Sequence, residues 1–364
     1  MTPTDPVLQA LVDQVRAASA AGEALDIRGG NTKAFYGEAQ HGSILDTTTL
    51  HGISSYEPTE LVVTARCGTT LADLEAALAE RGQCLPFEPP HFNIGSTVGG
   101  MVAAGLSGPS RATVGSVRDY VLGATLLNGR GDVLSFGGQV MKNVAGYDVS
   151  RLLAGSMGTL GVILEVSLKV LPVAPASATL RFQLDEDEAL QRMNEWAGLP
   201  LPINASAWWD GTLVLRLRGA LAAVNAAIGS LGGDLIEADF GSRFWEGLRH
   251  HSDEFFAHAA EAVRGGASLW RLSVPSTSPP LQLHGETLIE WGGAQRWVVS
   301  AQAATQVREA ARIVGGHATL FRGKDKSAGV FTPLAEPIAR IHRELKNSFD
   351  PAGVFNRGRM LPGL

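Results

Sequence analysis

Apolar residues in the first half of the chain alternate between helical spacing and short runs typical of strands. Val7, Leu11 and Val15 recur at helical spacing and predict an amphipathic helix. Thr70 precedes a second such segment and Gly82 follows it, as expected of a helix cap and a helix end. The predicted elements are a helix at 6–21, strands at 24–27, 43–46 and 61–66, helices at 70–81 and 98–106, an apolar run at 120–127 and a strand at 162–170.

After residue 170 the pattern changes. Pro172 and Pro175 interrupt the apolar rhythm, and we place a domain boundary here, with one domain at 1–174 and a second at 175–364. The sequence pattern of the second domain predicts an α+β fold, with an antiparallel sheet and helices on one of its faces. We find no internal sequence repeat. Its predicted strands are 179–184, 205–209, 213–217, 268–273, 286–291 and 296–300, and its predicted helices are 186–197, 220–231, 243–260, 303–314 and 333–349.

Glycine is concentrated in two clusters between residues 91 and 171. Glycine lets a backbone approach a ligand closely and permits positive φ, and exposed amides bind phosphate. This pattern favours a site for a long, phosphate-bearing cofactor, and tight turns in a glycine-rich sheet are the alternative. The clusters are Gly95, Gly99, Gly100, Gly105 and Gly108, then Gly146, Gly155, Gly158 and Gly161, with hydroxyls at Ser96, Thr97, Ser107, Ser156 and Thr159.

A second glycine-containing loop follows the first predicted strand. It reads Arg28-Gly29-Gly30-Asn31-Thr32-Lys33. Consecutive amides in such a loop can form an anion-binding nest, and either basic residue can add charge. A strand followed by Gly-Gly is also common in hairpins. The chain has neither a G-x-x-x-x-G-K-[ST] motif nor a G-x-G-x-x-G motif that opens a helix, so a Rossmann fold has little support.

Composition excludes several classes of protein. The 364 residues carry a net charge of −6 without a long basic run, which argues against nucleic-acid binding. Cys67 and Cys84 cannot hold an iron–sulfur cluster unaided, and we expect them to be small buried residues in a reducing compartment. The N-terminus lacks the pattern of a signal peptide, and no apolar run reaches the roughly 20 residues of a membrane span. We expect a cytoplasmic protein that reaches the inner face of the cell membrane only through partners.

Three motifs carry a resemblance to a known superfamily. The loop at 28–33, the run S-T-V-G-G at 96–100 and the run G-Y-D-V-S-R-L-L-A-G-S-M-G-T-L-G-V-I at 146–163 resemble the vanillyl-alcohol-oxidase/p-cresol-methylhydroxylase (PCMH) type of FAD-binding domain. The tail at 345–360 resembles the end of 2-hydroxy-acid dehydrogenases in that superfamily. The run K-N-V-A-G-Y-D-V-S-R-L at 142–152 is similar to the FAD-binding E subunits of bacterial glycolate oxidases (glycolate dehydrogenases).

The resemblance implies a two-lobed PCMH-type domain with non-covalent FAD, since residues 28–33 contain no His, Tyr or Cys to tether it. It also implies that the tail at 350–364, with Asn356 and Arg357, returns to the flavin domain. The first pyrophosphate loop is 28–33. The other implied contacts are Gly95, Ser96, Thr97, Gly99 and Gly100 at the pyrophosphate and flavin, Ser107, Gly108 and Arg111 at the ribityl chain and phosphate, and Gly155, Thr159, Gly161, Val162 and Ile163 near the adenine.

The resemblance further implies one subunit of a glycolate dehydrogenase complex that oxidises glycolate to glyoxylate. A second flavin subunit and an iron–sulfur subunit would take the electrons. Two departures from the family favour this over a self-sufficient D-lactate-type dehydrogenase. The segment at 315–322 lacks a His-x-Gly-Asp-Gly-Asn-x-His run, and Met157 stands where related enzymes often have Glu. We therefore expect no metal site, assign no catalytic residue, and keep the self-sufficient enzyme as the alternative and an empty flavin-fold scaffold as a third.

Other candidate residues have more ordinary interpretations. His250, His251 and His258 fall on one predicted helix, which we interpret as a solvated or partner-facing helix because a metal site needs matched further ligands. Tyr147 and Asp148 are either an acid/base pair or a packed ring and a helix cap. Trp208, Trp209 and Trp245 are expected in the core of the second domain. Arg322 and Lys324 could hold a carboxylate.

Overall fold

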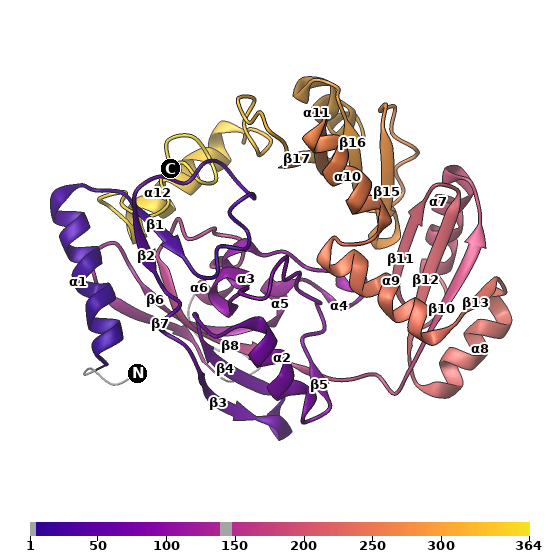
Figure 1. Cartoon of the computed structure of the whole chain (residues 1–364), viewed down its shortest axis with the longest axis horizontal. Coiled ribbons are helices and arrows are strands. Elements are labelled where there is room, and N and C mark those ends of the chain that lie inside the picture. The colour runs from indigo at the N-terminus through magenta and orange to yellow at the C-terminus, as the bar shows by residue number, and fades with distance from the viewer. Residues whose placement is uncertain (1–4, 139–147) are drawn as a thin grey trace.

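The computed structural model describes residues 5–138 and 148–364 of the chain. They form an α+β structure with two halves, each built on its own sheet (Figure 1). The N-terminal half holds a five-stranded sheet and two separate two-stranded sheets, β1-β2 and β5-β9. The C-terminal half holds an eight-stranded sheet. None of the helices in these two ranges is long and apolar enough to cross a membrane.

The first helix shows why the N-terminal elements form where the pattern predicts them. Helix α1 spans Pro6–Ala21, the predicted range. The Asp5 side chain accepts a hydrogen bond from the Val7 amide, and proline occupies the first turn, where its missing N–H costs nothing. Gly22 ends the helix with a φ of 68°. Val15 is fully buried against the core, together with Leu11 and Val12.

Two sheets of the N-terminal half are joined through this core. Strand β1 (Leu25–Arg28) pairs in parallel with β2 (Ser43–Asp46). The five-stranded sheet has the order β3-β4-β8-β6-β7 and is antiparallel in every pair. Its strands are Ile53–Glu57, Val62–Arg66, Val162–Lys169, Val121–Leu127 and Val133–Gly137, and its helices are α2 (Leu71–Ala79), α3 (Val98–Ala104), α4 (Arg111–Val114), α5 (Val117–Tyr120) and α6 (Val149–Leu152).

The eight-stranded sheet of the C-terminal half is antiparallel throughout, with the order β13-β10-β12-β11-β15-β16-β14-β17. The order contains the same arrangement twice. Strands β10 to β13 form one unit in the order β13-β10-β12-β11, and strands β14 to β17 form a second unit in the equivalent order β17-β14-β16-β15. The two units meet where β11 pairs with β15. The strands are Ala176–Gln183, Ile203–Trp209, Thr212–Gly219, Asp234–Ile236, Ser268–Ser273, Glu286–Glu290, Gln295–Ser300 and His317–Arg322, from β10 to β17.

The expectation of helices on one face of this sheet is wrong. Helices α7 (Glu186–Ala197), α8 (Leu221–Leu231) and α11 (Ala304–Ile313) pack on one face. Helices α9 (Ala238–His250) and α10 (Glu254–Arg264) pack on the other, beside Trp297 and Phe321. In β12 (Thr212–Gly219), Leu213, Leu215 and Leu217 lie on one face and Val214 lies on the other. All four are buried, so both faces need cover.

The predicted helix at 243–260 is also wrong, because the chain breaks there. His251 adopts a left-handed conformation with a φ of 56°, and Asp253 caps the helix that follows. The three histidines therefore do not share one helix. Trp208 and Trp245 are buried, which confirms the core interpretation for these two. Cys67 is buried and Cys84 is half-buried, and both are free thiols.

The end of the chain returns to the N-terminal half. Helix α12 (Glu336–Phe349) is followed by a tail in which Phe355 forms a parallel bridge with Leu25. The Lys346 ammonium is buried and bonds to the Asp350 carboxylate at 2.6 Å. We retain the proposed boundary between 174 and 175, which falls between β9 (Leu171–Pro172), paired with β5 (Gln83–Cys84), and β10.

Candidate functional site

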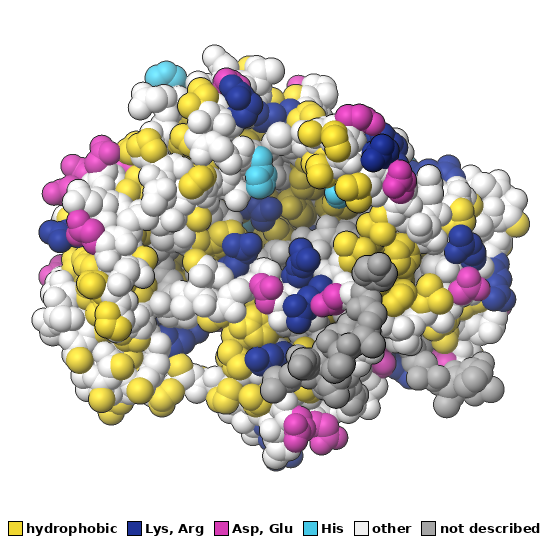
Figure 2. Space-filling model, turned by 180° about the vertical axis from the view of Figure 1, so that it is seen from behind, with side chains coloured by type: hydrophobic (Ala, Val, Ile, Leu, Met, Phe, Trp, Pro, Cys, Tyr) yellow, Lys and Arg dark blue, Asp and Glu magenta, His cyan; other side chains and the backbone are white. Residues whose placement is uncertain are grey.

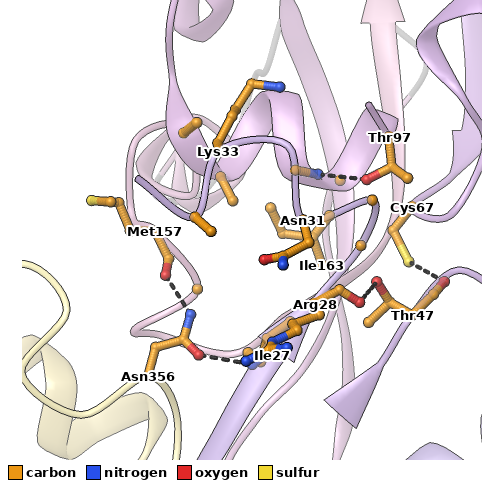
Figure 3. A pocket seen from close by; sticks show the side chains of 18 of the residues that line it. Ile27, Arg28, Asn31, Lys33, Thr47, Cys67, Thr97, Met157, Ile163 and Asn356 are labelled. Carbon is orange, nitrogen blue, oxygen red and sulfur yellow. Dashed lines mark hydrogen bonds between the residues drawn. The ribbon is translucent and has the colours of Figure 1, made fainter. Parts of the chain in front are cut away.

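A cavity lies where β1, the start of α3 and the C-terminal tail meet (Figure 3). Eleven of the predicted site residues line it, drawn from all three of the glycine-containing segments. They are Arg28, Gly29, Gly30, Asn31, Thr32, Lys33, Thr97, Gly99, Gly100, Gly161 and Ile163.

The loop at 28–33 presents backbone donors to this cavity. Within the described parts of the chain, none of the five consecutive N–H groups from Gly29 to Lys33 donates a hydrogen bond. Asn31 has a φ of 53°, a left-handed conformation that Asn tolerates better than most residues. Successive amides in mixed right- and left-handed conformations form a concave nest for an anion. The loop therefore has the donors that a phosphate requires.

Close packing of the loop explains its two glycines, neither of which has a positive φ. A Cβ on Gly30 would lie 1.5 Å from the Gly95 carbonyl oxygen, and one on Gly29 would lie 2.3 Å from Thr97 Oγ1. Both distances are far inside van der Waals contact. The first glycine cluster thus acts on the cavity by holding the loop at 28–33 in place.

Lys33 adds positive charge beside this nest. Its ammonium group donates to Ser96 Oγ at 2.7 Å and has no carboxylate oxygen within 4 Å among the residues described. Burial lowers the pKa of Lys33 to about 8. A bound anion would stabilise the ammonium form, so this residue favours a negatively charged ligand.

The amides at the start of α3 are already used within the protein. The Gly99 N–H donates to the Cys67 carbonyl at 2.8 Å, and the Gly100 N–H donates to Thr97 Oγ1 at 3.3 Å. Position 99 has no room for a side chain, since a Cβ on Gly99 would lie 2.6 Å from Cys67 Cβ. This segment shapes the wall of the cavity, whereas the unbonded amides lie on the loop at 28–33.

The remaining predicted residues do not line the cavity. Ser96 holds Lys33, and Gly95 packs against Gly30. Ser107 Oγ accepts from the Val117 amide. Cofactor contact stays a prediction for each of them. The residues outside the lining are Gly95, Ser96, Ser107, Gly108, Arg111, Gly155, Thr159 and Val162.

Two tail residues that sequence reasoning did not assign to the cofactor complete the cavity. Asn356 Oδ1 accepts from the Ile27 amide at 2.8 Å, and Asn356 Nδ2 donates to the Met157 carbonyl at 2.7 Å (Figure 3). This side chain joins β1 to the second glycine cluster. Arg359 donates to the carbonyl oxygens of Lys33, Ala34 and Glu38. The only signal in the sequence was the expected return of the tail to this domain.

The remaining candidates have structural roles or lie elsewhere. Asp148 caps α6 by accepting from the Arg151 amide, which favours the cap interpretation, while Tyr147, Gly146 and the run at 142–147 lie outside the described residues. Lys324 donates to the Arg264 carbonyl at the surface. Among residues 5–138 and 148–364, no three His, Cys, Asp or Glu side chains are grouped as a metal site would require.

A buried ion-pair network joins the two halves next to the site. Glu88 accepts from Arg216 Nη2 at 2.7 Å and from Arg218 Nη1 at 3.0 Å. Burial alone would raise the pKa of Glu88, but the charges and hydrogen bonds of these arginines lower it to about 2. Glu88 thus bonds across the junction between the segment before the first glycine cluster and β12.

Comparisons with known proteins agree with this geometry. A family model described as an FAD binding domain matches residues 8–137. The chain is 48% identical to glycolate oxidase subunit GlcE of Escherichia coli (strain K12) over 352 residues, 97% of each protein. It is 33% identical over 139 residues to glycolate oxidase subunit GlcD of Bacillus subtilis (strain 168), which covers 38% of this chain and 29% of GlcD.

Solved structures show the same fold at low sequence identity. A structure of alkyldihydroxyacetonephosphate synthase superposes on 96% of this chain and 74% of its own, with a TM-score of 0.62 and 15% identity. Because identity this low supports the fold alone, membership of a family rests on the sequence match over nearly the full length. The chain therefore belongs to the family of the glycolate oxidase subunit GlcE and contains an FAD binding domain.

Proposed function

We propose that this chain is the FAD-binding subunit of a multi-subunit glycolate dehydrogenase that oxidises glycolate to glyoxylate. The observation that carries the proposal is the row of five unbonded amides, Gly29 to Lys33, in the wall of the cavity. Amide N–H groups that lack a hydrogen-bond acceptor, whether a ligand or water, cost free energy. A row of such amides suits a pyrophosphate. The full-length match to GlcE supports the substrate.

The residues present fit FAD without a covalent link. The nest at 29–33 and Lys33 would hold the pyrophosphate, and Asn356 and Arg359 would keep that loop in place. Gly161 and Ile163 also line the cavity. FAD, when bound, supplies the two-electron acceptor for a 2-hydroxy acid and can pass electrons on singly. The protein's own part is to bind, orient and shield it.

We further propose that electrons leave this chain through partner subunits, a second flavin subunit and an iron–sulfur subunit. Two observations support this. The relative at 48% identity is named as a subunit. The two cysteines here are too few to hold a cluster. Free thiols fit the cytoplasm, where we place the complex, with its partners providing contact to the inner face of the cell membrane.

Purification of the chain with and without its partners tests the proposal. We expect a yellow protein with about one FAD per chain, all of it released by acid precipitation, and little dye-linked glycolate or D-lactate oxidation by the chain alone. Adding the co-purifying subunits should restore turnover. A colourless protein that takes up no FAD would refute the flavoprotein assignment. Full turnover by the lone chain would favour a self-sufficient 2-hydroxy-acid dehydrogenase.

A further inference from the structure

Basic side chains without an acidic partner gather where the two halves meet. Figure 2 shows a hollow between the halves with Lys and Arg side chains around it and an apolar floor. Arg111 at the start of α4, Arg271 on β14 and Arg322 at the end of β17 lie on three separate segments. In the part of the chain that the structure describes, none of the three has a carboxylate oxygen within 4 Å. Arg271 and Arg322 are half-buried, whereas Arg111 is exposed. Unpaired cations of this kind suit an anionic ligand.

Arg271 connects this region directly to the cofactor cavity. Its Nη2 donates to the Tyr36 hydroxyl at 3.1 Å, and Tyr36 lines the cavity. The guanidinium carbon lies 5.6 Å from the Tyr36 ring centroid and 5.9 Å from that of Phe321, so two aromatic rings hold it in position. This bond to Tyr36 is the only hydrogen bond recorded for the guanidinium among the described residues. Most of its five N–H donors remain available.

Arg111 and Arg322 are held in the same manner by stacking. The guanidinium carbon of Arg111 lies 4.6 Å from the Trp291 ring centroid, and that of Arg322 lies 3.6 Å from the Phe35 ring centroid. Partial desolvation lowers the pKa of Arg111, and the charge of Arg271 lowers it further, so the charges of these two side chains repel each other in the absence of an anion. Asp119 is the acid that opposes this effect, but its carboxylate is bonded to the Ser116 amide and hydroxyl.

We infer that Arg271, Tyr36 and Arg111 form a binding site for the carboxylate of a small 2-hydroxy or 2-oxo acid, beside the cofactor cavity. The inference rests on the proposed function and names the residues that would recognise its substrate class. A guanidinium fork matches the two oxygens of a carboxylate, and the Tyr36 hydroxyl can donate to one of them. Arg322 adds charge from the side of Phe35.

Binding of oxalate to the FAD-loaded chain tests this site without turnover. Oxalate carries carboxylates but no C–H bond, so it cannot be oxidised by hydride loss. Equilibrium dialysis with radiolabelled oxalate should show one saturable site in the wild type. We expect Arg271→Gln to weaken binding by about 10- to 100-fold and Arg271→Lys by less, since hydrogen bonds to a charged group are worth this much and lysine lacks the fork.

Further variants separate the site from general effects of charge. Arg111→Gln and Tyr36→Phe should each weaken oxalate binding by about 3- to 30-fold, the range expected for losing one hydrogen-bonding or charged partner. Arg312→Gln is the matched control, because Arg312 is exposed and pairs with Glu309 on α11. It should bind oxalate as the wild type does. Far-ultraviolet circular dichroism should be unchanged in all five variants. Each variant is loaded with FAD, as judged by its absorbance, before oxalate is added, because Tyr36 lines the cofactor cavity and Arg111 is a predicted cofactor contact.

Each outcome decides between the inference and the function on which it rests. A wild type that holds FAD but binds no oxalate overturns the carboxylate site and leaves the flavoprotein intact. Unchanged oxalate binding in folded, FAD-loaded Arg271→Gln overturns the role of Arg271. Equal competition by sulfate at the same ionic strength shows a general anion site and overturns the carboxylate assignment. A wild type that takes up no FAD refutes the proposed function itself.

Discussion

Replacing Gly30 by alanine tests the packing of the pyrophosphate loop. A Cβ at this position would lie 1.5 Å from the Gly95 carbonyl oxygen and 2.4 Å from its carbon. Since real Cβ contacts stay beyond about 3.0 Å, the two loops must separate by at least about 1.5 Å. Gly100→Ala offers a comparison in the same cavity, because its Cβ would meet only Thr97 Oγ1, at 3.1 Å.

The expected loss of affinity follows from the amides that this movement displaces. A hydrogen bond to a charged group is worth about 1.5–3 kcal/mol, and we expect at least two of the five amides of the nest to lose their alignment. Gly30→Ala should therefore weaken FAD binding by about 3–6 kcal/mol, or roughly 150- to 20,000-fold. Gly100→Ala should cost less than about tenfold, since only one side-chain oxygen has to move by a few tenths of an ångström.

Titration of the apoprotein with FAD, followed by flavin fluorescence, measures these affinities. Gly229→Ala is the control for the substitution itself, because Gly229 lies in α8 with nothing within 4 Å of the added Cβ. It should leave FAD affinity unchanged and stabilise the helix by about 1 kcal/mol. If Gly30→Ala keeps its fold and binds FAD within threefold of the wild type, the packing argument for this loop is refuted.

Three further predictions concern pH and buried polar groups. FAD affinity should fall as pH rises above about 8, because burial lowers the pKa of Lys33 in the free site while a bound phosphate favours the ammonium form. The stability of the apoprotein should rise over the same pH range, since the unfolded chain then binds more protons than the folded chain. Titrations of Lys33→Met at several pH values should show neither dependence. Asn356→Leu should lower the free energy of unfolding by about 2–6 kcal/mol and lower the FAD content, because it leaves the Ile27 amide and the Met157 carbonyl without partners. Urea denaturation measures the change, and an unchanged unfolding curve contradicts this prediction. Because the pKa of Glu88 is lowered to about 2, this residue contributes stability that is complete above its unfolded pKa of 4.5 and is lost as pH falls towards 2. The acid-unfolding profile of Glu88→Gln should lack this loss of stability. A profile like that of the wild type argues against the ion pair between the two halves.

Local signals determined much of the N-terminal half. Helix α1 has the predicted bounds, because the cap at Asp5, the proline and Gly22 act within a few residues of the helix ends. The glycine-containing loop at 28–33 was also evident in the sequence, and it lines the cavity as the predicted anion nest requires. The resemblance of three motifs to a known superfamily extended this to FAD, and an FAD binding domain model matches residues 8–137.

Tertiary structure decided which groups are available and what surrounds them. The amides at the start of α3 matched the loop at 28–33 in sequence character, yet Cys67 and Thr97 occupy them. Asn356 and Arg359 reach the cavity from more than 300 residues away in the chain. No local pattern encodes such contacts, because they depend on where the tail packs.

The C-terminal half shows the same division between local pattern and tertiary packing. Strand and helix types followed from apolar spacing, but the cover on both faces of the sheet, the break at His251 and the repeated strand order did not. Spacing along a strand records which residues are apolar, and only the assembled sheet determines which elements cover each face. The unpaired state of Arg111 and Arg271 is likewise a property of the fold, since a charge is paired or free only in relation to distant neighbours.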